Sequence, residues 1–534
     1  MRKLFQRRVL SIFLAASFLA FSFFCAKKQT ETDKKKILRI GTTREGFKSA
    51  SLLGDTFLSL FAHISNPPLV AMSENGDPER LVVERYEVSA DCRTWRFYCD
   101  PEFFWSDGTQ VSAEDAKFSI EVLAEKVPHG RWLQEIIGEV FVDDDNALVL
   151  ELKKPYSRLD FDFATGNILP KHIWEKIEDP LRHISRGGIV GCGPFIVEQI
   201  DLNSGVIRFK KNSYWKGPQP ELEGIELNLY NNIDVLAFAL EKGEVDTYYR
   251  YASSYPYPNI ERLRRTEEFD FMEESHYSLR FLGFNLDRKP MADIRFREAI
   301  AYAIDYGEII KLDLLDYGEI PNRGFIPPIM PNYKETPSLE FDRNKADALL
   351  TEAGYIDRDR DGFRELPGGG ELKLSILISK DYVRTAELVQ DYLKTAGIDT
   401  SLQTVDYNTW VSMKDKNNYD LVVSRTSPWG MFMHANWATG YFDARRTGEG
   451  VLHNVDDPRF LQLCDGILST KDEGKLDEYA SCIQDYYTQN LPAIALYWSR
   501  IVVPSRKNIT GWAPNPLYGI YNIKNFLSLR IADR

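Results

Sequence analysis

Short runs of alternating hydrophobic and polar residues, separated by segments with helical spacing, recur along most of this chain. The clearest example is residues 281–310, FLGFNLDRKPMADIRFREAIAYAIDYGEII. The apolar run Phe281–Asn285 is typical of a buried strand. Asp293 stands at the N-cap position of a helix whose apolar residues recur at helical spacing from Ile294 to Ile304. This pattern alone predicts a strand and a helix that pack into a core, and it indicates no catalytic or ligand-binding residue.

The same patterns predict further elements. Strands are expected at residues 37–43, 86–91, 94–98, 372–378, 398–404 and 420–424, and a strand pair around a turn at 141–152. Helices are expected at 341–354 and 383–397, and Ser112 followed by Asp115 predicts a capped helix start. Because helices and strands alternate in the second half, this half is predicted to form an α/β unit.

Length and charge narrow the classes of protein. With 534 residues, the chain is expected to fold into two or three domains. A formal net charge of −13 argues against nucleic acid as a partner, because binding phosphates requires a basic surface. The sequence contains no GxSxG, HExxH or Walker A motif, and no GxGxxG after a strand. The sequence therefore favours a binding protein over an enzyme, and no cofactor is expected.

The first residues predict export and a membrane anchor. A basic start (Arg2, Lys3, Arg7 and Arg8) precedes the apolar stretch Val9–Phe24, which is typical of a signal peptide over residues 1–24. Cys25 follows directly, and polar residues continue to position 36. This order predicts a lipoprotein in which Cys25 carries the lipid and residues 25–36 form the tether. The alternative is cleavage at another position, which would release a soluble form.

The five remaining cysteines are Cys92, Cys99, Cys192, Cys464 and Cys482. Their odd number leaves at least one of them free. Cys92 with Cys99, or Cys464 with Cys482, are the candidate disulfides, and the sequence does not decide between bridged and free thiols.

Several longer motifs resemble one known family. They are WSDG at 105–108, SAEDAKFS at 112–119, ILPKH at 168–172, GCGPF at 191–195, NSYW at 212–215, ALEKGEVD at 239–246, and FLGFNL with ADIRFREAIAYAID within 281–305. Together they resemble the bacterial extracellular solute-binding proteins of family 5, the oligopeptide-, dipeptide- and nickel-binding components of ABC importers. The resemblance runs, with gaps, from about Ile37 to Leu527.

The resemblance implies an α/β, two-lobed periplasmic-binding-protein fold (type II, class C-like) with an extra domain inserted in the first lobe. Lobe I is expected at 37–75, 187–280 and 498–534, the inserted domain II at 76–186, and lobe II (domain III) at 281–497. Two chain crossings, near Leu279–Asn285 and Leu496–Val503, are expected to act as a hinge. The implied partners are a small-molecule or peptide ligand and an ABC permease, and the implied state is a monomer in the periplasm or another extracytoplasmic space.

The expected ligand contacts lie between the two lobes. Outside the loop that follows residue 425, they are Phe47, Arg250, Tyr251, Arg425 and Tyr497. That loop is rich in Trp, Met, Tyr and Gly, and its candidate contacts are Trp429, Met431, His434, Trp437 and Tyr441. Loops that leave strand ends in α/β units are frequent ligand sites.

A short peptide is the expected ligand. In peptide-binding relatives this loop carries an aspartate that holds the peptide amine, but no acidic residue occurs between Ser424 and Phe442 here. The alternatives are nickel or a metal chelate bound through His434 and Arg425, and a surface adhesin on the same fold. Residues 357–362 copy the first half of an EF-hand loop, but Gly368 stands where the bidentate glutamate belongs, so no calcium site is expected.

Overall fold

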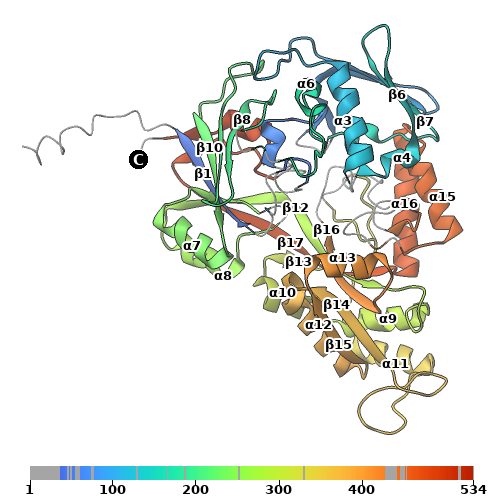
Figure 1. Ribbon diagram of the computed structural model, residues 1–534. Helices are drawn as coiled ribbons and strands as arrows, with labels where there is room; N and C mark the ends of the chain where they lie inside the picture. The colour runs from blue at the N-terminus through green and yellow to red at the C-terminus, as the bar shows by residue number, and fades with distance from the viewer. Residues whose placement is uncertain are drawn as a thin grey trace, which may run out of the picture.

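The computed structural model describes most of the chain from residue 36 onward. The described residues are 36–44, 47, 51–54, 61–73, 77–127, 130–164, 166–183, 185, 188–250, 253–328, 331–426, 442–445, 452, 454–514 and 519–532. They form two α/β lobes and a smaller unit that lies beside the first lobe (Figure 1). Within these residues, no helix has the length and apolar character needed to cross a membrane.

One mixed sheet runs through both lobes in the strand order β15-β14-β16-β12-β17-β11-β1-β10-β9-β8. In the first lobe, β1 pairs in parallel with β10 and β11. The described elements of this lobe are β1 (Ile37–Thr43), η2 (Ala62–Ile64), β2 (Val70–Met72), β3 (Pro78–Arg80), β8 (Phe195–Asp201), β9 (Val206–Lys211), β10 (Gly224–Tyr230), α7 (Ile233–Lys242), β11 (Thr247–Tyr248), α8 (Tyr257–Arg264), β18 (Ile509–Thr510), α17 (Ile523–Ser528) and β19 (Arg530–Ile531).

The smaller unit is built on an antiparallel sheet in the order β4-β5-β7-β6, against which α3 packs. Its elements are β4 (Val83–Val88), β5 (Thr94–Cys99), α3 (Ala113–Lys126), α4 (Leu133–Ile136), β6 (Ile137–Val142), β7 (Leu148–Leu152), α5 (Leu159–Asp162) and α6 (Lys171–Trp174). We call it the inserted unit.

The second lobe is the α/β unit predicted for the second half of the chain. Strand β14 pairs in parallel with β15 and β16, and β16 pairs antiparallel with β12. Its elements are α9 (Ile294–Ala303), α10 (Tyr306–Leu314), β13 (Gly318–Glu319), α11 (Arg343–Glu352), β14 (Lys373–Ser379), η4 (Lys380–Tyr382), α12 (Val383–Thr395), β15 (Asp399–Val405), α13 (Tyr407–Asp415), β16 (Leu421–Thr426), α15 (Pro458–Leu468) and α16 (Glu473–Asn490).

Two long strands belong to both lobes. β12 (Phe269–Phe284) and β17 (Ala493–Arg506) pair antiparallel from Phe269 opposite Arg506 to Gly283 opposite Ala493. We call this pair the β12–β17 ribbon, and Figure 1 shows it running from one lobe into the other. Its register shifts between Glu274 and Tyr277 and again between Arg280 and Phe281. Such irregularities bend strands, so the ribbon bends near the two predicted crossings.

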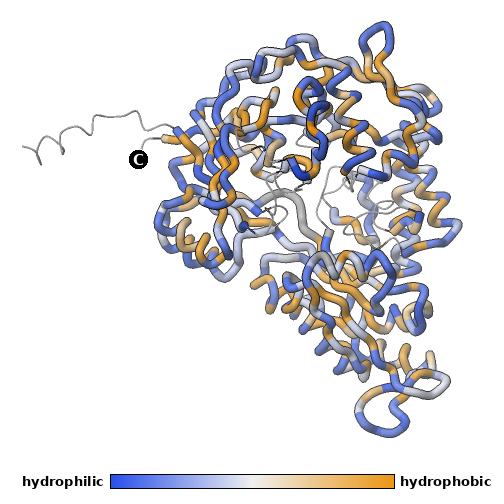
Figure 2. Tube along the Cα trace, in the orientation of Figure 1, coloured by the Kyte–Doolittle hydropathy of each residue, from blue (hydrophilic) through white to orange (hydrophobic). Residues whose placement is uncertain are grey.

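Separate hydrophobic cores fill these units. Buried apolar residues form one cluster in the second lobe, one in the inserted unit and two in the first lobe. Figure 2 shows the hydrophobic positions concentrated along the strands inside each unit. This division agrees with the expected domains, whose boundaries remain a prediction.

Many local predictions are confirmed. Strand β1 has the predicted bounds, and Asp293 caps α9 by accepting a hydrogen bond from the amide of Arg295. The predicted helix from Ile294 differs at its end, because α9 stops at Ala303 and Ile304 is extended. A second helix, α10, then begins under a new cap, Asp305. The five cysteines of the described residues are free thiols, so neither candidate disulfide forms.

The predicted cap of α3 is a full capping box. The hydroxyl of Ser112 accepts from the amide of Asp115, and the carboxylate of Asp115 accepts from the amide of Ser112 at 2.9 Å. We expect Ser112→Ala to lower the free energy of unfolding by about 1 kcal/mol, because the amide of Asp115 loses its cap. Urea unfolding measures this change, with Ser112→Thr as a control that keeps the hydroxyl. An equal loss in both variants would contradict the role of the cap.

Candidate ligand site between the two lobes

A group of polar side chains gathers where the β12–β17 ribbon enters the second lobe. Arg280 of β12 donates from Nε to the hydroxyl of Tyr497 on β17 at 3.2 Å. Its guanidinium also lies over the ring of Tyr382, 4.2 Å from the ring centroid. These contacts fix the direction of the Arg280 side chain, because an aromatic face and a hydrogen bond hold it at the same time.

The hydroxyl of Tyr497 continues this network into the second lobe. It donates to Oδ2 of Asp313 on α10 at 3.0 Å, and the hydroxyl of Thr385 on α12 donates to the same oxygen at 2.6 Å. Burial raises the pKa of Tyr497, so its hydroxyl keeps its proton and remains a donor. The carboxylate of Asp313 thus accepts hydrogen bonds from two hydroxyl groups, and Tyr497 links it to Arg280.

Two further arginines lie close to this group. Arg425 stands opposite Arg280 in the pairing of β16 with β12, and its Nη1 donates to the hydroxyl of Ser253 in the first lobe at 3.0 Å. Arg250 follows β11 in the first lobe. Burial raises the pKa of Tyr248 to about 12, although Arg250 and Arg425 both favour its ionised form. Both cations therefore lie near Tyr248, at the junction of the lobes.

The candidate ligand contacts fall into three groups. Arg250 and Arg425 are half-buried at the junction of the lobes. Phe47 is buried in the first-lobe core and lies 5.2 Å from the ring of Phe61, whereas Tyr497 is buried in the second-lobe core. Cys25, the predicted site of lipid attachment, lies outside the described residues, as do the candidates Tyr251, Trp429, Met431, His434, Trp437 and Tyr441.

Sequence reasoning missed Arg280 and, apart from Tyr497, the residues around it. Arg280 is a charged residue within the otherwise apolar run Leu279–Phe284, and this departure from the pattern was the available signal. Nothing in the sequence indicated that Tyr382, Asp313 and Thr385 would meet it, because they come from three separate segments. In the Tyr-rich segment 248–258, Tyr248 and Tyr255 are buried together in a first-lobe core.

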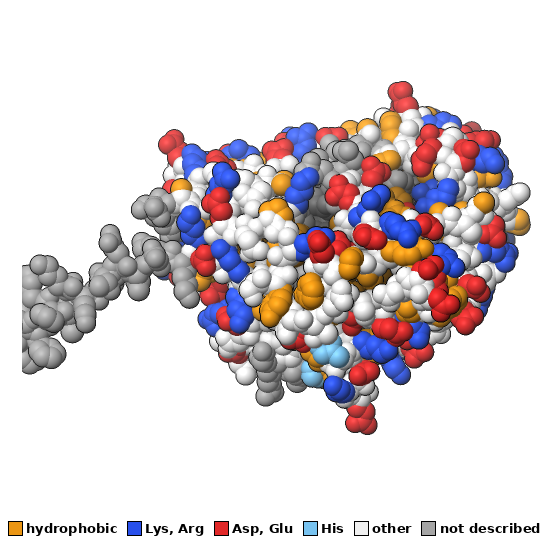
Figure 3. Space-filling model, turned by 90° about the horizontal axis from the view of Figure 1, so that it is seen from above, with side chains coloured by type: hydrophobic (Ala, Val, Ile, Leu, Met, Phe, Trp, Pro, Cys, Tyr) orange, Lys and Arg blue, Asp and Glu red, His pale blue; other side chains and the backbone are white. Residues whose placement is uncertain are grey.

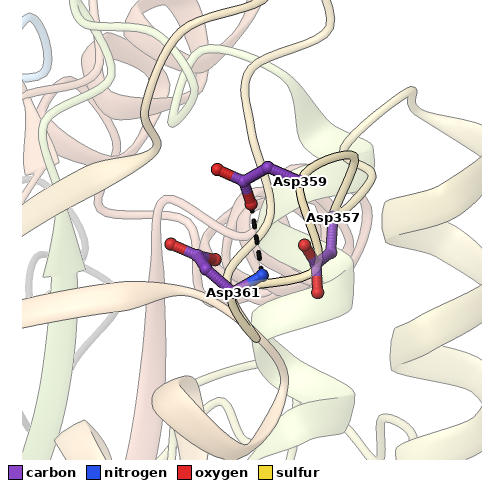
Figure 4. Close-up of side chains that lie close together, drawn as sticks. All are labelled: Asp357, Asp359 and Asp361. Atoms are coloured by element: carbon purple, nitrogen blue, oxygen red, sulfur yellow. Dashed lines mark hydrogen bonds between the residues drawn. The ribbon is translucent and has the colours of Figure 1, made fainter.

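The acidic loop after α11 is the group of at least three potential metal-ligating side chains found within the described residues. Asp357, Asp359 and Asp361 offer carboxylate oxygens within 4.8 Å of one another (Figure 4). The same oxygens accept backbone amides of the turn, including Gly362 to Asp357 at 3.1 Å and Asp361 to Asp359 at 3.2 Å. These hydrogen bonds stabilise the turn itself, and the loop lies away from the ribbon (Figure 1).

The inserted unit contacts the second lobe at a place away from the ribbon (Figure 1). The amide of Ser157 in the inserted unit donates to the carbonyl of Leu468 at 2.7 Å, and Nζ of Lys471 lies 3.1 Å from Oδ2 of Asp160. Lys471 also lies over the ring of Trp95, 4.5 Å from its centroid. We call this set the distal contact. In Figure 1, α15 and α16 extend from the second lobe to the inserted unit, which they meet there.

Charged side chains of both signs lie on the face of the molecule shown in Figure 3. Acidic and basic side chains are interspersed there, and the described part of that face has no continuous basic patch.

Known proteins share both the sequence pattern and the fold of this chain. The sequence is 25% identical over 482 residues to the dipeptide-binding protein of Escherichia coli (strain K12), covering 83% of this chain and 85% of the relative. It is 24% identical over 383 residues to the nickel-binding periplasmic protein of the same strain, covering 70% of each. Among solved structures, the periplasmic oligopeptide-binding protein of an ABC transporter from Thermotoga maritima superposes with a TM-score of 0.79 at 20% identity, covering 94% of this chain and 100% of that one.

A second solved structure shares the fold, the oligopeptide-binding protein of Bacillus subtilis in complex with a nonapeptide. It superposes with a TM-score of 0.77 at 18% identity, over 94% of this chain and 100% of that chain. The family model described as "Bacterial extracellular solute-binding proteins, family 5 Middle" matches residues 77–448. Members of this family are binding proteins of ABC importers. The two-lobed fold and this match over more than half of the sequence show that the chain belongs to the bacterial extracellular solute-binding proteins of family 5.

Proposed function

We propose that this protein captures short peptides outside the cytoplasmic membrane and delivers them to an ABC permease. The observation that carries the proposal is the ribbon: two bent strands join two α/β lobes, and arginines from both lobes gather where the ribbon crosses. The similarity to a dipeptide-binding protein over most of both chains supports a peptide as the ligand. The nickel alternative uses Arg425 and His434, and His434 lies outside the described residues.

The mechanism follows from the connections between the lobes. Bending of the β12–β17 ribbon at its register shifts opens and closes the space between them. A ligand that contacts both lobes stabilises the closed form by its difference in affinity for the two forms. The permease then recognises the closed form, and the binding protein performs no chemistry.

Native mass spectrometry of protein purified without refolding tests the ligand class. We expect a spread of co-purifying masses that match short peptides and are lost after denaturation and refolding. A single metal-containing mass that a chelator removes would overturn the peptide assignment in favour of the nickel alternative. Protein that binds neither ligand but still binds a host surface would favour the adhesin alternative.

The lipid anchor is part of the same proposal. Cys25 follows an apolar stretch, and a lipid on its thiol would hold the protein at a membrane while residues 26–36 act as the tether. We expect Cys25→Ala to move the protein from the membrane fraction to the soluble fraction, as measured by fractionation and immunoblotting. An unchanged distribution would contradict anchoring through Cys25.

The distal contact predicts a shift between open and closed forms. Lys471→Met keeps most of the side-chain length but removes the ammonium group bound to Asp160, at a cost of about 1–2 kcal/mol to the closed form. We expect a larger radius of gyration of the ligand-free protein in small-angle X-ray scattering. Lys475→Met is the matched control, because Lys475 is an exposed lysine four residues further on, in the first turn of α16. Equal radii for both variants would contradict a role of this contact in closure.

A further inference from the structure

Two tyrosines from different lobes stack on each other beside the β12–β17 ribbon. Tyr257 is the first residue of α8 in the first lobe, and Tyr317 directly precedes β13 in the second lobe. Their ring centroids lie 5.1 Å apart, and their ring planes differ by 10°. β13 in turn pairs with β17 at Ser499 and Trp498. The stack therefore connects a helix of one lobe to a strand of the other.

Arg500 of β17 is held from both lobes at one point. Its carbonyl oxygen accepts from the hydroxyl of Tyr257 at 2.7 Å, and its amide donates to the carbonyl oxygen of Tyr317 at 3.0 Å. Burial raises the pKa of Tyr257, so this hydroxyl keeps its proton and remains a donor. The hydroxyl of Tyr317 donates to Glu261 on α8 at 3.3 Å. We call Tyr257, Tyr317 and Arg500 the hinge brace.

The hinge brace spans the first bend of the ribbon. The first register shift falls between Ile501 and Arg500 of β17. On the first-lobe side of this shift, α8 packs in one core with Val502, whereas β13 pairs with Ser499 on the other side. Irregularities of this kind bend strands. The brace therefore ties together the parts of the chain that lie on either side of the bend.

Both rings also pack where the cores of the two lobes approach each other. Tyr257 packs against the second-lobe core and against a first-lobe core, and Tyr317 packs against the same first-lobe core. In Figure 1, α8 and α10 lie on the left of the ribbon, whereas α15 and α16 reach the distal contact on its right. Bending of the ribbon that parts the distal contact therefore also moves the two rings relative to each other.

We propose that the hinge brace restrains the opening of the lobes, which separate only when the stack of Tyr257 on Tyr317 slides or parts. This inference rests on the hinge motion of the proposed function and not on its ligand. A stacked aromatic pair and a hydrogen bond each shift an equilibrium by roughly 2- to 10-fold. The brace is thus strong enough to set the balance between open and closed forms, and too weak to prevent opening.

Hydrogen exchange of the intact ligand-free protein, resolved to single amides by mass spectrometry, tests the brace from a distance. The amide of Ser157 reports opening, because its hydrogen bond to the carbonyl of Leu468 joins the inserted unit to the second lobe. Two variants weaken the brace. Tyr317→Ala removes one ring of the stack, and Tyr257→Phe keeps the ring but removes the hydroxyl.

Tyr407→Ala is the matched control for the loss of a stacked tyrosine. Tyr407 stacks on Trp410 with the ring centroids 5.9 Å apart, and both residues belong to α13 in the second lobe. This variant therefore removes a stack that does not join the lobes. The amides of β14 supply a second reference, because this strand is paired on both sides within the second-lobe sheet.

We expect the Ser157 amide to exchange about 2- to 10-fold faster in Tyr317→Ala and in Tyr257→Phe than in the wild type, because the open population is larger. Tyr407→Ala should keep the wild-type rate at Ser157, and the β14 amides should be unchanged in both brace variants. Unchanged exchange at Ser157 in both brace variants would overturn the inference. An equal acceleration at β14 would also overturn it, since it would show a general loss of stability.

The wild-type protein separates failure of the brace from failure of the hinge. If its Ser157 amide exchanges no faster than the β14 amides, the lobes do not open, and the hinge mechanism and the brace both fail. If the Ser157 amide exchanges faster than β14 but at the same rate in both brace variants, the brace alone fails. No ligand enters these comparisons, so a wrong peptide assignment would leave their outcome unchanged.

Discussion

Phe281→Ala should lower the free energy of unfolding by about 3–5 kcal/mol, the range for a buried phenylalanine that leaves a cavity. The Phe281 side chain is fully buried, and its ring lies 5.5 Å from that of Phe325 in the second-lobe core. It also stands directly after the second register shift of the β12–β17 ribbon, where the chain enters this lobe. Urea unfolding followed by circular dichroism measures the change.

Phe341→Ala provides the matched control for Phe281. Phe341 lies in the same lobe, but its side chain is 48% exposed. Its loss should change stability by no more than about 0.5 kcal/mol, as for most surface substitutions. A comparable loss from both variants would show that aromatic content, and not the core around the ribbon, determines the stability of this lobe.

Asp246→Ala should cost roughly 2–3 kcal/mol of unfolding free energy, because it leaves the charge of Arg39 without its partner. Asp246 is buried and accepts three hydrogen bonds from Arg39: from the backbone amide at 2.9 Å, from Nε at 3.0 Å and from Nη2 at 2.6 Å. These bonds join β1 to the residues just before β11. The estimate lies below the usual cost for a fully buried pair, since the side chain of Arg39 is 30% exposed.

Thermal unfolding measures this change, and the exposed pair of Lys211 and Glu223 supplies the comparison. Glu223→Ala removes an ion pair of 2.8 Å on the same sheet, with side chains that are 30% and 52% exposed. Such pairs contribute little, so a loss below about 1 kcal/mol is expected. If Asp246→Ala lowered the free energy of unfolding by no more than Glu223→Ala does, the buried pair would not be the interaction that stabilises β1.

Local signals in the sequence predicted many of the elements that carry the fold. The cap of α11 at Asp342 and its end before Gly354 were readable, because a capping side chain and a left-handed glycine act within a few residues. The break between α9 and α10 could not be read from the sequence, because apolar spacing continues across Ile304 while Asp305 starts a new helix. Spacing reports which face is buried, and it does not report where the backbone turns.

The candidate site was less predictable, because it depends on contacts between distant segments. Arg250 and Arg425 were predicted, and the charge of each acts on Tyr248. Phe47 was predicted to contact the ligand but is buried in the first-lobe core, because an aromatic residue in an irregular segment can fill a core as well as line a cleft. The position of Arg280 beside Arg425 follows only from the strand register, which sets the two residues opposite each other.

The distal contact has a consequence for how fast a ligand is exchanged. The ribbon closes one side of the space between the lobes, and the distal contact closes another, with Ser157 and Asp160 both buried. A ligand held there leaves only after the hydrogen bonds to Leu468 and Lys471 have broken. Dissociation is then limited by the opening of the protein and not by the ligand's own contacts, so chemically different ligands should have similar residence times. A permease that separates Lys471 from Asp160 would release any of them.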